Sequence, residues 1–236
     1  MDEKQRFRKR VREILGSLRC QKIAIKLDTL TITGTDYAFI GLAMLERPDT
    51  VVGMNIDLSK DQGGGSASML PRDLAAGRPI VAFSIPPKAW YADTYHEEMI
   101  IVHEATHASI EARPGLTIRL LTNEALSYLA GAMYNRLGGA GEAFFDPVRD
   151  DRPPPHKLIP ESRNVLIAAD NLATITIARP NGTITQTELR PVEDTVAAHP
   201  IYANLRAHPA MTHTGQGIRL ARTPAIDPSV RHVLLR

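Results

Sequence analysis

His103-Glu104-Ala105-Thr106-His107 forms an H-E-x-x-H pentapeptide near the middle of the chain. In an α-helix, residues i and i+4 lie on the same face, so His103 and His107 can direct two imidazole nitrogens toward one point. Glu104 projects about 100° around the helix from His103, which suits a general base acting on a metal-bound water better than a third ligand. The pentapeptide therefore predicts a metal site if it lies on a helix.

The residues on both sides of the pentapeptide predict such a helix. Thr94 and Glu97 have the spacing of a capping box, and Glu97 and Glu98 place negative charge in the first turn, where the helix dipole favours it. Pro114-Gly115 ends the pattern of apolar residues. The expected helix runs from about Tyr95 to Ala112.

A catalytic zinc site uses three protein ligands and leaves a fourth position for water. Glu111 continues the row of His107, but along a straight helix it lies about 12 Å from His103 and cannot converge on the same ion. Glu124 can, because it lies on a second helix that is predicted to begin near Leu120. We therefore expect Zn2+ to be held by His103, His107 and Glu124.

This arrangement resembles the gluzincin metallopeptidases, the group that includes thermolysin. In that group the H-E-x-x-H helix is followed by a helix with a ligand Glu, often within N-E-x-x-S-D, and residues 123–127 (N-E-A-L-S) match this pattern. Tyr128 stands where the family has an Asp that orients the first His, so the resemblance implies that the Tyr128 hydroxyl reaches the ring of His103. The resemblance covers roughly residues 78–137 and extends to compact bacterial zincin domains, some of them in toxin or effector proteins.

The fold class expected from the pattern and the resemblance is α+β and zincin-like. A small mixed or antiparallel sheet should pack on the active-site helix and the ligand-bearing helix, with an N-terminal helix and a partly irregular C-terminal segment. Strands are predicted at Lys22–Leu27, Leu30–Thr33, Tyr37–Ala43, Val51–Ile56 and Pro79–Ile85. By resemblance alone, Ala82–Ile85 would hold the substrate backbone by strand addition.

The rest of the chain divides by composition. The first residues, to about Leu18, predict a basic amphipathic helix, which is typical of a docked helix with a solvated face or, less often, of a nucleic-acid or membrane-surface arm. A proline-rich connection suggests two units, residues 1–145 as the metallopeptidase domain and 146–236 as a C-terminal extension. In the extension we expect a helix at Val165–Ile177, a turn at Asn181-Gly182, a short helix at Val192–His199 and extended chain beyond Leu205.

Composition restricts the class of protein. The chain has 236 residues, 43% of them hydrophobic, so it can bury a large core. Its formal net charge is only +2, which gives no strong signal for nucleic-acid binding. No apolar run approaches the roughly 20 residues that span a membrane. The single cysteine excludes an internal disulfide, and the N-terminus lacks the apolar core of a secretory signal. The expected location is the cytoplasm, or outside the cell after export without a classical signal peptide.

The function expected from these residues is zinc-dependent hydrolysis of peptide bonds, in which Glu104 takes a proton from the activated water and returns it to the leaving amine. The expected partners are a peptide or protein substrate and, for a toxin, an inhibitor or cognate partner protein. Two alternatives stay open: a delivered toxin or effector hydrolase acting on another amide, such as a peptidoglycan peptide, or an inactive metal-stabilised interaction module. The group that stabilises the oxyanion also stays open among Tyr128, Tyr134, His156, His199, His208, His213 and His232.

Overall fold

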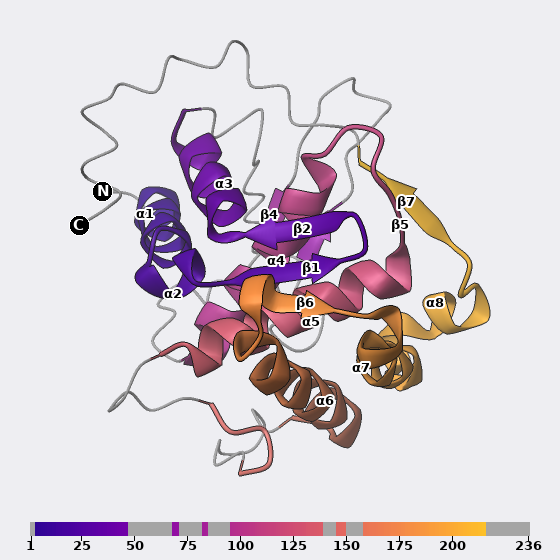
Figure 1. Ribbon diagram of the computed structural model, residues 1–236. Helices are drawn as coiled ribbons and strands as arrows, with labels where there is room; N and C mark the ends of the chain where they lie inside the picture. The colour runs from indigo at the N-terminus through magenta and orange to yellow at the C-terminus, as the bar shows by residue number, and fades with distance from the viewer. Residues whose placement is uncertain are drawn as a thin grey trace.

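The computed structural model of the protein describes residues 3–46, 68–70, 82–84, 95–138, 145–149 and 158–215. Within these ranges it is a mostly helical α+β structure with small sheets, which confirms the α+β part of the predicted class (Figure 1). Its helices are α1 (Glu3–Leu15), α2 (Leu18–Gln21), α3 (Gly34–Glu46), α4 (Tyr95–Glu111), α5 (Leu120–Arg136), α6 (Pro160–Ile177), α7 (Gln186–Ala198) and α8 (Ala203–Ala207), with short 3-10 helices η3 (Pro180–Gly182) and η4 (Pro200–Tyr202). Its strands are β1 (Ala24–Leu27), β2 (Leu30–Thr33), β3 (Ser68–Leu70), β4 (Ala82–Ser84), β5 (Thr117–Arg119), β6 (Thr183–Ile184) and β7 (Thr212–Thr214).

The largest sheet in the described ranges is mixed, with the strand order β2-β1-β6. Strand β1 pairs with β2 antiparallel, with Ile25 opposite Ile32, and with β6 parallel, with Leu27 opposite Ile184. All four side chains are buried. The sheet therefore joins the N-terminal part of the chain to the segment that follows α6 (Figure 1).

The entry to β6 depends on a glycine. Asn181 and Gly182 have φ angles of 59° and 60°, which confirms the predicted turn. A Cβ atom at Gly182 would lie only 1.6 Å from the carbonyl oxygen of Ala24 in β1. Glycine is therefore required here both for its backbone conformation and for the close approach of the two segments.

One strand prediction is wrong, because residues 37–43 lie within α3. The Asp36 carboxylate accepts a hydrogen bond of 2.7 Å from the backbone N–H of Thr33, as in one half of a capping box. Tyr37 and Ile40, three residues apart, are both fully buried, whereas Leu42 is exposed. A short apolar run suits a buried helix as well as a strand, and local capping decides for the helix here.

The helices that carry the motif residues match their predicted bounds closely. α4 begins at Tyr95, as predicted, and α5 begins at Leu120. The backbones of the two helices approach closely at Gly131 of α5, where a Cβ atom would lie 3.0 Å from the carbonyl oxygen of Met99 in α4. This contact brings the H-E-x-x-H helix and the helix with Glu124 together.

The predicted helix at Val165–Ile177 is confirmed as part of α6, but α7 begins at Gln186 instead of Val192. Thr185 caps α7, since its side chain accepts a bond from the backbone N–H of Glu188 while the Glu188 carboxylate accepts one from the backbone N–H of Thr185. Because of this complete capping box, the helix begins six residues before the predicted start and includes Pro191 in its interior.

One hydrophobic core joins the N-terminal and C-terminal parts of the described chain. It crosses the predicted boundary at residue 146 and includes side chains from α1, β1, α4, α5, α6 and α7, among them Val11, Ile25, Val102, Leu126, Val165 and Val196. Beyond Leu205 the chain forms the end of α8 and then β7, which pairs antiparallel with β5 and places His213 opposite Ile118. The predicted strand at Val51–Ile56 and residues 216–236 lie outside the described residues.

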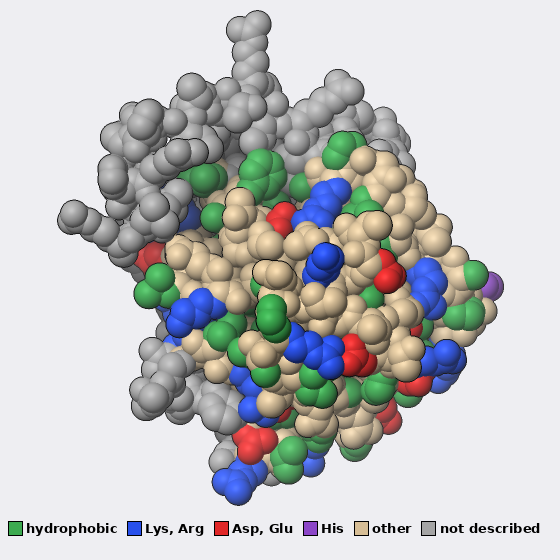
Figure 2. All heavy atoms as spheres, viewed as in Figure 1, with side chains coloured by type: hydrophobic (Ala, Val, Ile, Leu, Met, Phe, Trp, Pro, Cys, Tyr) green, Lys and Arg blue, Asp and Glu red, His purple; other side chains and the backbone are tan. Residues whose placement is uncertain are grey.

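The surface carries both signs of charge. On the face seen in Figure 2, the Lys and Arg side chains of the described residues are interspersed with Asp and Glu side chains. Such mixing differs from the concentrated basic patch that is typical of nucleic-acid binding. Among the described residues, no helix is long and apolar enough to cross a membrane.

Candidate metal centre

The H-E-x-x-H residues lie in the second half of α4, which confirms the helix that the pentapeptide requires. The Thr106 hydroxyl donates a hydrogen bond of 2.8 Å to the carbonyl of Val102 and lies 2.9 Å from the hydroxyl of Tyr37 in α3. Thr106 and Tyr37 are both fully buried. The pentapeptide is thus fixed against α3 on one side, while its histidines face α5 on the other.

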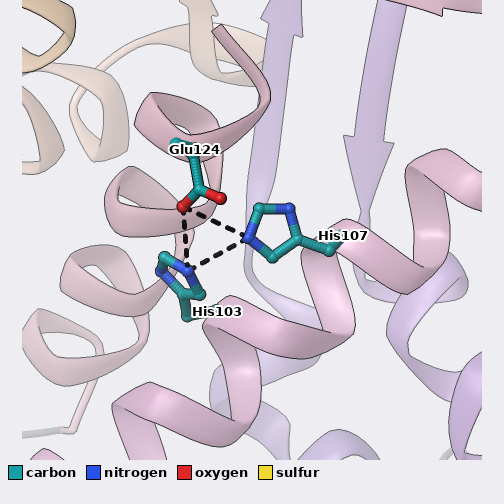
Figure 3. A group of neighbouring side chains, drawn as sticks. All are labelled: His103, His107 and Glu124. Atoms are coloured by element: carbon teal, nitrogen blue, oxygen red, sulfur yellow. Dashed lines mark hydrogen bonds and ion pairs between the residues drawn. The ribbon is translucent and has the colours of Figure 1, made fainter. Parts of the chain in front are cut away.

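The predicted ligands come together at one point between α4 and α5. Figure 3 shows the rings of His103 and His107 pointing toward the carboxylate of Glu124. The two Nε2 atoms are 3.1 Å apart, and each lies 3.5 Å from Oε2 of Glu124. The three side chains form a group that could hold a metal ion, the only such group in the part of the chain that the structure describes.

These separations can be compared with the geometry of zinc sites. Tetrahedral coordination with bonds of about 2.0–2.1 Å places neighbouring ligand atoms about 3.3–3.4 Å apart. The observed distances of 3.1, 3.5 and 3.5 Å lie close to that value. Oε2 of Glu124 is also a buried oxygen that makes no hydrogen bond in the described structure, as a ligand atom reserved for a cation would be. The residues therefore fit a tetrahedral ion.

His107 and Glu124 strongly influence each other's ionisation. Burial alone would lower the pKa of His107, but the negative charge of Glu124 beside its ring raises that pKa to about 9. Burial would raise the pKa of Glu124, but the two histidines hold it well below its usual range. Glu124 is thus ionised at neutral pH, and a metal ion would replace the proton of His107 as its partner.

The far side of the His107 ring is anchored by α5. Its Nδ1 atom lies 2.9 Å from Oδ1 of Asn123 and 3.2 Å from Oγ of Ser127, and all three side chains are buried. An amide oxygen only accepts, so Nδ1 carries a proton and donates it, and Nε2 would direct its lone pair at the ligand group once a metal ion displaces its own proton. Asn123 and Ser127 belong to the N-E-x-x-S motif, so their roles could have been predicted from their spacing around Glu124.

Glu104 follows His103 on α4 and is 4% exposed. It does not belong to the group of converging ligand atoms. Its negative charge is one of the influences that raise the pKa of His107, so its carboxylate lies near that imidazole. Glu104 therefore lies outside the ligand group, and its charge acts on the ionisation of His107.

Tyr128 contacts His103, one of the three converging side chains, through its ring. Its ring centroid lies 4.5 Å from that of His103, and the rings meet edge to face at 73°. The hydroxyl, expected to reach the imidazole, instead lies 3.2 Å from the hydroxyl of Tyr202. Tyr128 therefore orients the His103 ring by packing, and its hydroxyl is part of a tyrosine pair.

No sequence pattern predicts a place for Tyr202 beside these residues. This tyrosine ends η4, 74 residues after Tyr128, and nothing in the sequence signals that this turn folds back to α5. Burial raises the pKa of the Tyr202 hydroxyl well above its usual value, and the nearby charge of Glu124 raises it further. Tyr202 thus stays protonated, and its hydroxyl lies beside that of Tyr128, the residue whose ring packs on His103.

Glu111 takes no part in this group. Its carboxylate forms a short contact with Nε2 of His213 in β7. Glu111, the last residue of α4, therefore contacts β7, the strand that pairs with β5. This agrees with the distance argument that separates Glu111 from the ligands.

The remaining candidates for the oxyanion-stabilising group lie in other contacts. The Tyr134 hydroxyl donates a hydrogen bond of 2.9 Å to Glu98, and His199 lies 2.8 Å from the hydroxyl of Ser162. His208 follows α8 on the surface. His156 and His232 lie outside the described residues.

No family model, curated protein or solved structure matches this chain. The sequence motif and the geometry of the site are therefore what a functional proposal can rest on.

Proposed function

We propose that this chain is a zinc metallopeptidase with a zincin-like active site of the gluzincin type. The observation that carries the proposal is the convergence of His103, His107 and Glu124 at separations that suit tetrahedral coordination. Two imidazoles and one carboxylate are the ligand set of a catalytic zinc with one open position. Calcium and magnesium favour oxygen ligands, so the two nitrogens argue against them.

A zinc ion bound here would supply a Lewis acid that activates water near neutral pH. Glu104 is then the general base. Its carboxylate is buried and its charge acts on His107, and in this proposal it accepts the proton of the attacking water as the new C–O bond forms at the scissile carbonyl carbon. Glu104 returns that proton to the amine nitrogen as the C–N bond breaks, so water is consumed and one peptide becomes two.

The tyrosine pair supplies the hydrogen-bond donor that the negative charge on the carbonyl oxygen requires. Tyr128 and Tyr202 are both protonated near neutral pH, since burial is the largest influence that raises the pKa of each hydroxyl. The Tyr202 hydroxyl lies near Glu124 and bonds to that of Tyr128, so one hydroxyl can turn to a substrate while the other supports it. We assign the donor role to Tyr202, with Tyr128 holding it and packing on His103.

Zinc analysis and a peptide-library assay test this proposal together. The purified chain should carry close to one zinc, and removal of the metal by a chelator should abolish cleavage until zinc is restored. Glu104→Gln should retain the zinc and the melting temperature while hydrolysis falls by about two to four orders of magnitude, because the variant keeps the size of the side chain and loses the base.

The outcomes separate the proposed peptidase from the alternatives. Equal cleavage by wild type and Glu104→Gln would overturn the mechanism. Zinc binding without cleavage of the library or of peptidoglycan peptides would favour the interaction module. Cleavage of peptidoglycan peptides alone would assign the same site to a toxin or effector hydrolase.

A further inference from the structure

His199 lies at the junction of α7 and η4 and contacts both the turn that follows it and α6. Its Nδ1 atom accepts a hydrogen bond of 3.2 Å from the backbone N–H of Ile201, which caps η4. Its Nε2 atom lies 2.8 Å from the hydroxyl of Ser162 in α6. Because Nδ1 accepts, the proton of the neutral ring is on Nε2 and is donated to Ser162. The imidazole therefore ties η4 to α6 in one tautomer.

The same ring also contacts the tyrosine at the end of the turn. The centroids of His199 and Tyr202 are 5.7 Å apart, with the rings tilted by 57°. The backbone N–H of Tyr202 donates a hydrogen bond of 3.0 Å to the carbonyl of His199. Both the backbone and the ring of Tyr202 thus depend on His199.

The short length of η4 makes this support important. The helix has only three residues and begins with Pro200. Proline has no backbone N–H, so Pro200 donates no hydrogen bond to the turn. Ile201 is 65% exposed and contributes little packing. The capping bond from the Ile201 N–H to His199 therefore helps to fix the conformation that carries the Tyr202 hydroxyl to Tyr128, together with the packing of the Tyr202 ring on the core.

We propose that His199 is a positioning residue that holds η4 so that the Tyr202 hydroxyl lies at the metal centre, with Ser162 fixing the His199 tautomer. The proposal rests on the proposed function and deepens it. It explains how a segment remote from the H-E-x-x-H motif completes the site: α6 holds His199, His199 holds η4, and η4 presents Tyr202 to the substrate oxygen.

The experiment has a structural arm and a kinetic arm, both on the full zinc-loaded chain. In the first, amide hydrogen exchange is measured at Ile201 and Tyr202 in wild type, His199→Ala and His199→Asn. Exchange should accelerate at least tenfold in His199→Ala because the cap is lost, and return toward wild type in His199→Asn, since an asparagine oxygen also caps a helix start. Unchanged exchange in His199→Ala overturns the proposal whether or not the chain is a peptidase.

In the kinetic arm, His199→Ala should lower kcat at least tenfold with zinc affinity and KM within about twofold, and His199→Asn should recover most of the loss. Tyr202→Phe should lower kcat by about 100-fold, as loss of an oxyanion donor does. The double variant His199→Ala/Tyr202→Phe should be no slower than Tyr202→Phe alone, because both changes remove the same interaction. Additive effects, or wild-type kcat in His199→Ala, overturn the proposal.

If His199→Ala folds poorly, Ser162→Ala takes its place, because it removes only the hydrogen bond that fixes the His199 tautomer. Ser162→Ala should lower kcat by a smaller factor than His199→Ala. Combined with Tyr202→Phe, it should lower kcat no further than Tyr202→Phe alone. An unchanged kcat in folded Ser162→Ala would remove Ser162 from the proposal. A wild type that cleaves no substrate overturns the proposed function and the catalytic role of Tyr202 together, while the exchange measurement still decides whether His199 holds the turn.

Discussion

Nδ1 of His107 lies 2.9 Å from the side-chain oxygen of Asn123, the residue directly before Glu124. One helix turn of α5 therefore supplies both a proposed metal ligand and the partner that orients another proposed ligand on α4. Partners of this kind fix the tautomer and the direction of the imidazole, and their loss typically costs 10–100-fold in metal affinity.

We therefore expect Asn123→Ala to weaken zinc binding by about 10–100-fold, measured by competition with a chelator of known affinity. Asn135→Ala is the matched control, because Asn135 is a buried asparagine of the same helix that bonds to the backbone of Phe145 instead. The control should lose stability and keep its zinc affinity. Equal zinc affinities in Asn123→Ala and wild type would remove Asn123 from the site.

The ligand set can be tested by single substitutions. His103→Ala, His107→Ala and Glu124→Ala should each reduce bound zinc from about one per chain to nearly none, because two remaining ligands hold the ion poorly. Glu111→Ala is the control, since it removes a glutamate of α4 that contacts His213 and lies outside the ligand group. Metal content follows from elemental analysis after dialysis. Loss of zinc from Glu111→Ala, or retention in Glu124→Ala, would require a different third ligand.

The pH dependence of stability should differ between the zinc-loaded protein and protein stripped with a chelator. Without zinc, the pKa of His107 is about 9 in the folded chain and about 6.5 in the unfolded chain. Its protonation thus stabilises the fold fully below pH 6.5, and this contribution is lost as the pH rises through 9. The pKa of Glu124 is shifted downward, so its contribution is present above its unfolded value and is lost in acid.

Stripped wild type should therefore be most stable near pH 5–6 and lose roughly 1–3 kcal/mol of unfolding free energy between pH 6 and 10 relative to Glu124→Gln. Urea denaturation of both proteins across this range measures the difference. Saturating zinc should flatten the dependence around pH 8, because the ion and not the proton then balances Glu124. Parallel curves for wild type and Glu124→Gln would show that the two side chains are not coupled.

The site could be predicted from sequence where its determinants are local. The capping residues and the apolar stripe around His103 predict the start of α4 correctly. The rise per residue of a helix excludes Glu111 from the group of His103 and His107 and favours Glu124, which the structure places with them. The Asn123 and Ser127 contacts follow from the same spacing, since i−1 and i+3 of Glu124 face the same neighbouring helix.

The parts that could not be predicted depend on contacts between distant segments or on competing local signals. Tyr202 reaches the site only because α6 and α7 pack on α5, which no local pattern encodes. The apolar run at Tyr37–Ala43 predicts a strand, but the hydrogen bond between the Thr33 backbone N–H and Asp36 caps a helix, α3, that includes it. Pro191 argues against helix at its position, but the Thr185–Glu188 capping box and burial of Val192 outweigh it.

The junction between β1 and β6 provides the last prediction, which concerns how the C-terminal segment is joined to the rest of the chain. At Gly182 an added Cβ would lie 1.6 Å from the Ala24 carbonyl oxygen, and that oxygen belongs to a backbone held in the sheet. Gly115 also has a positive φ, 78°, but a Cβ there would meet no atom within 4 Å. Substitution of Gly115 therefore tests backbone strain alone, whereas substitution of Gly182 adds a collision with the backbone of β1.

Gly115→Ala should cost about 1 kcal/mol of unfolding free energy, the strain of a side chain in the left-handed region. Gly182→Ala should cost at least about 3 kcal/mol, because strain is joined by a displacement of β6 from β1. Urea unfolding with a fluorescence or circular dichroism readout measures both. A cooperative transition with the larger loss in Gly182→Ala would show that the N-terminal sheet and the C-terminal helices unfold together. Equal losses in the two variants, or a C-terminal segment that unfolds alone in wild type, would show instead that the pairing of β6 with β1 contributes little to joining the two parts of the chain.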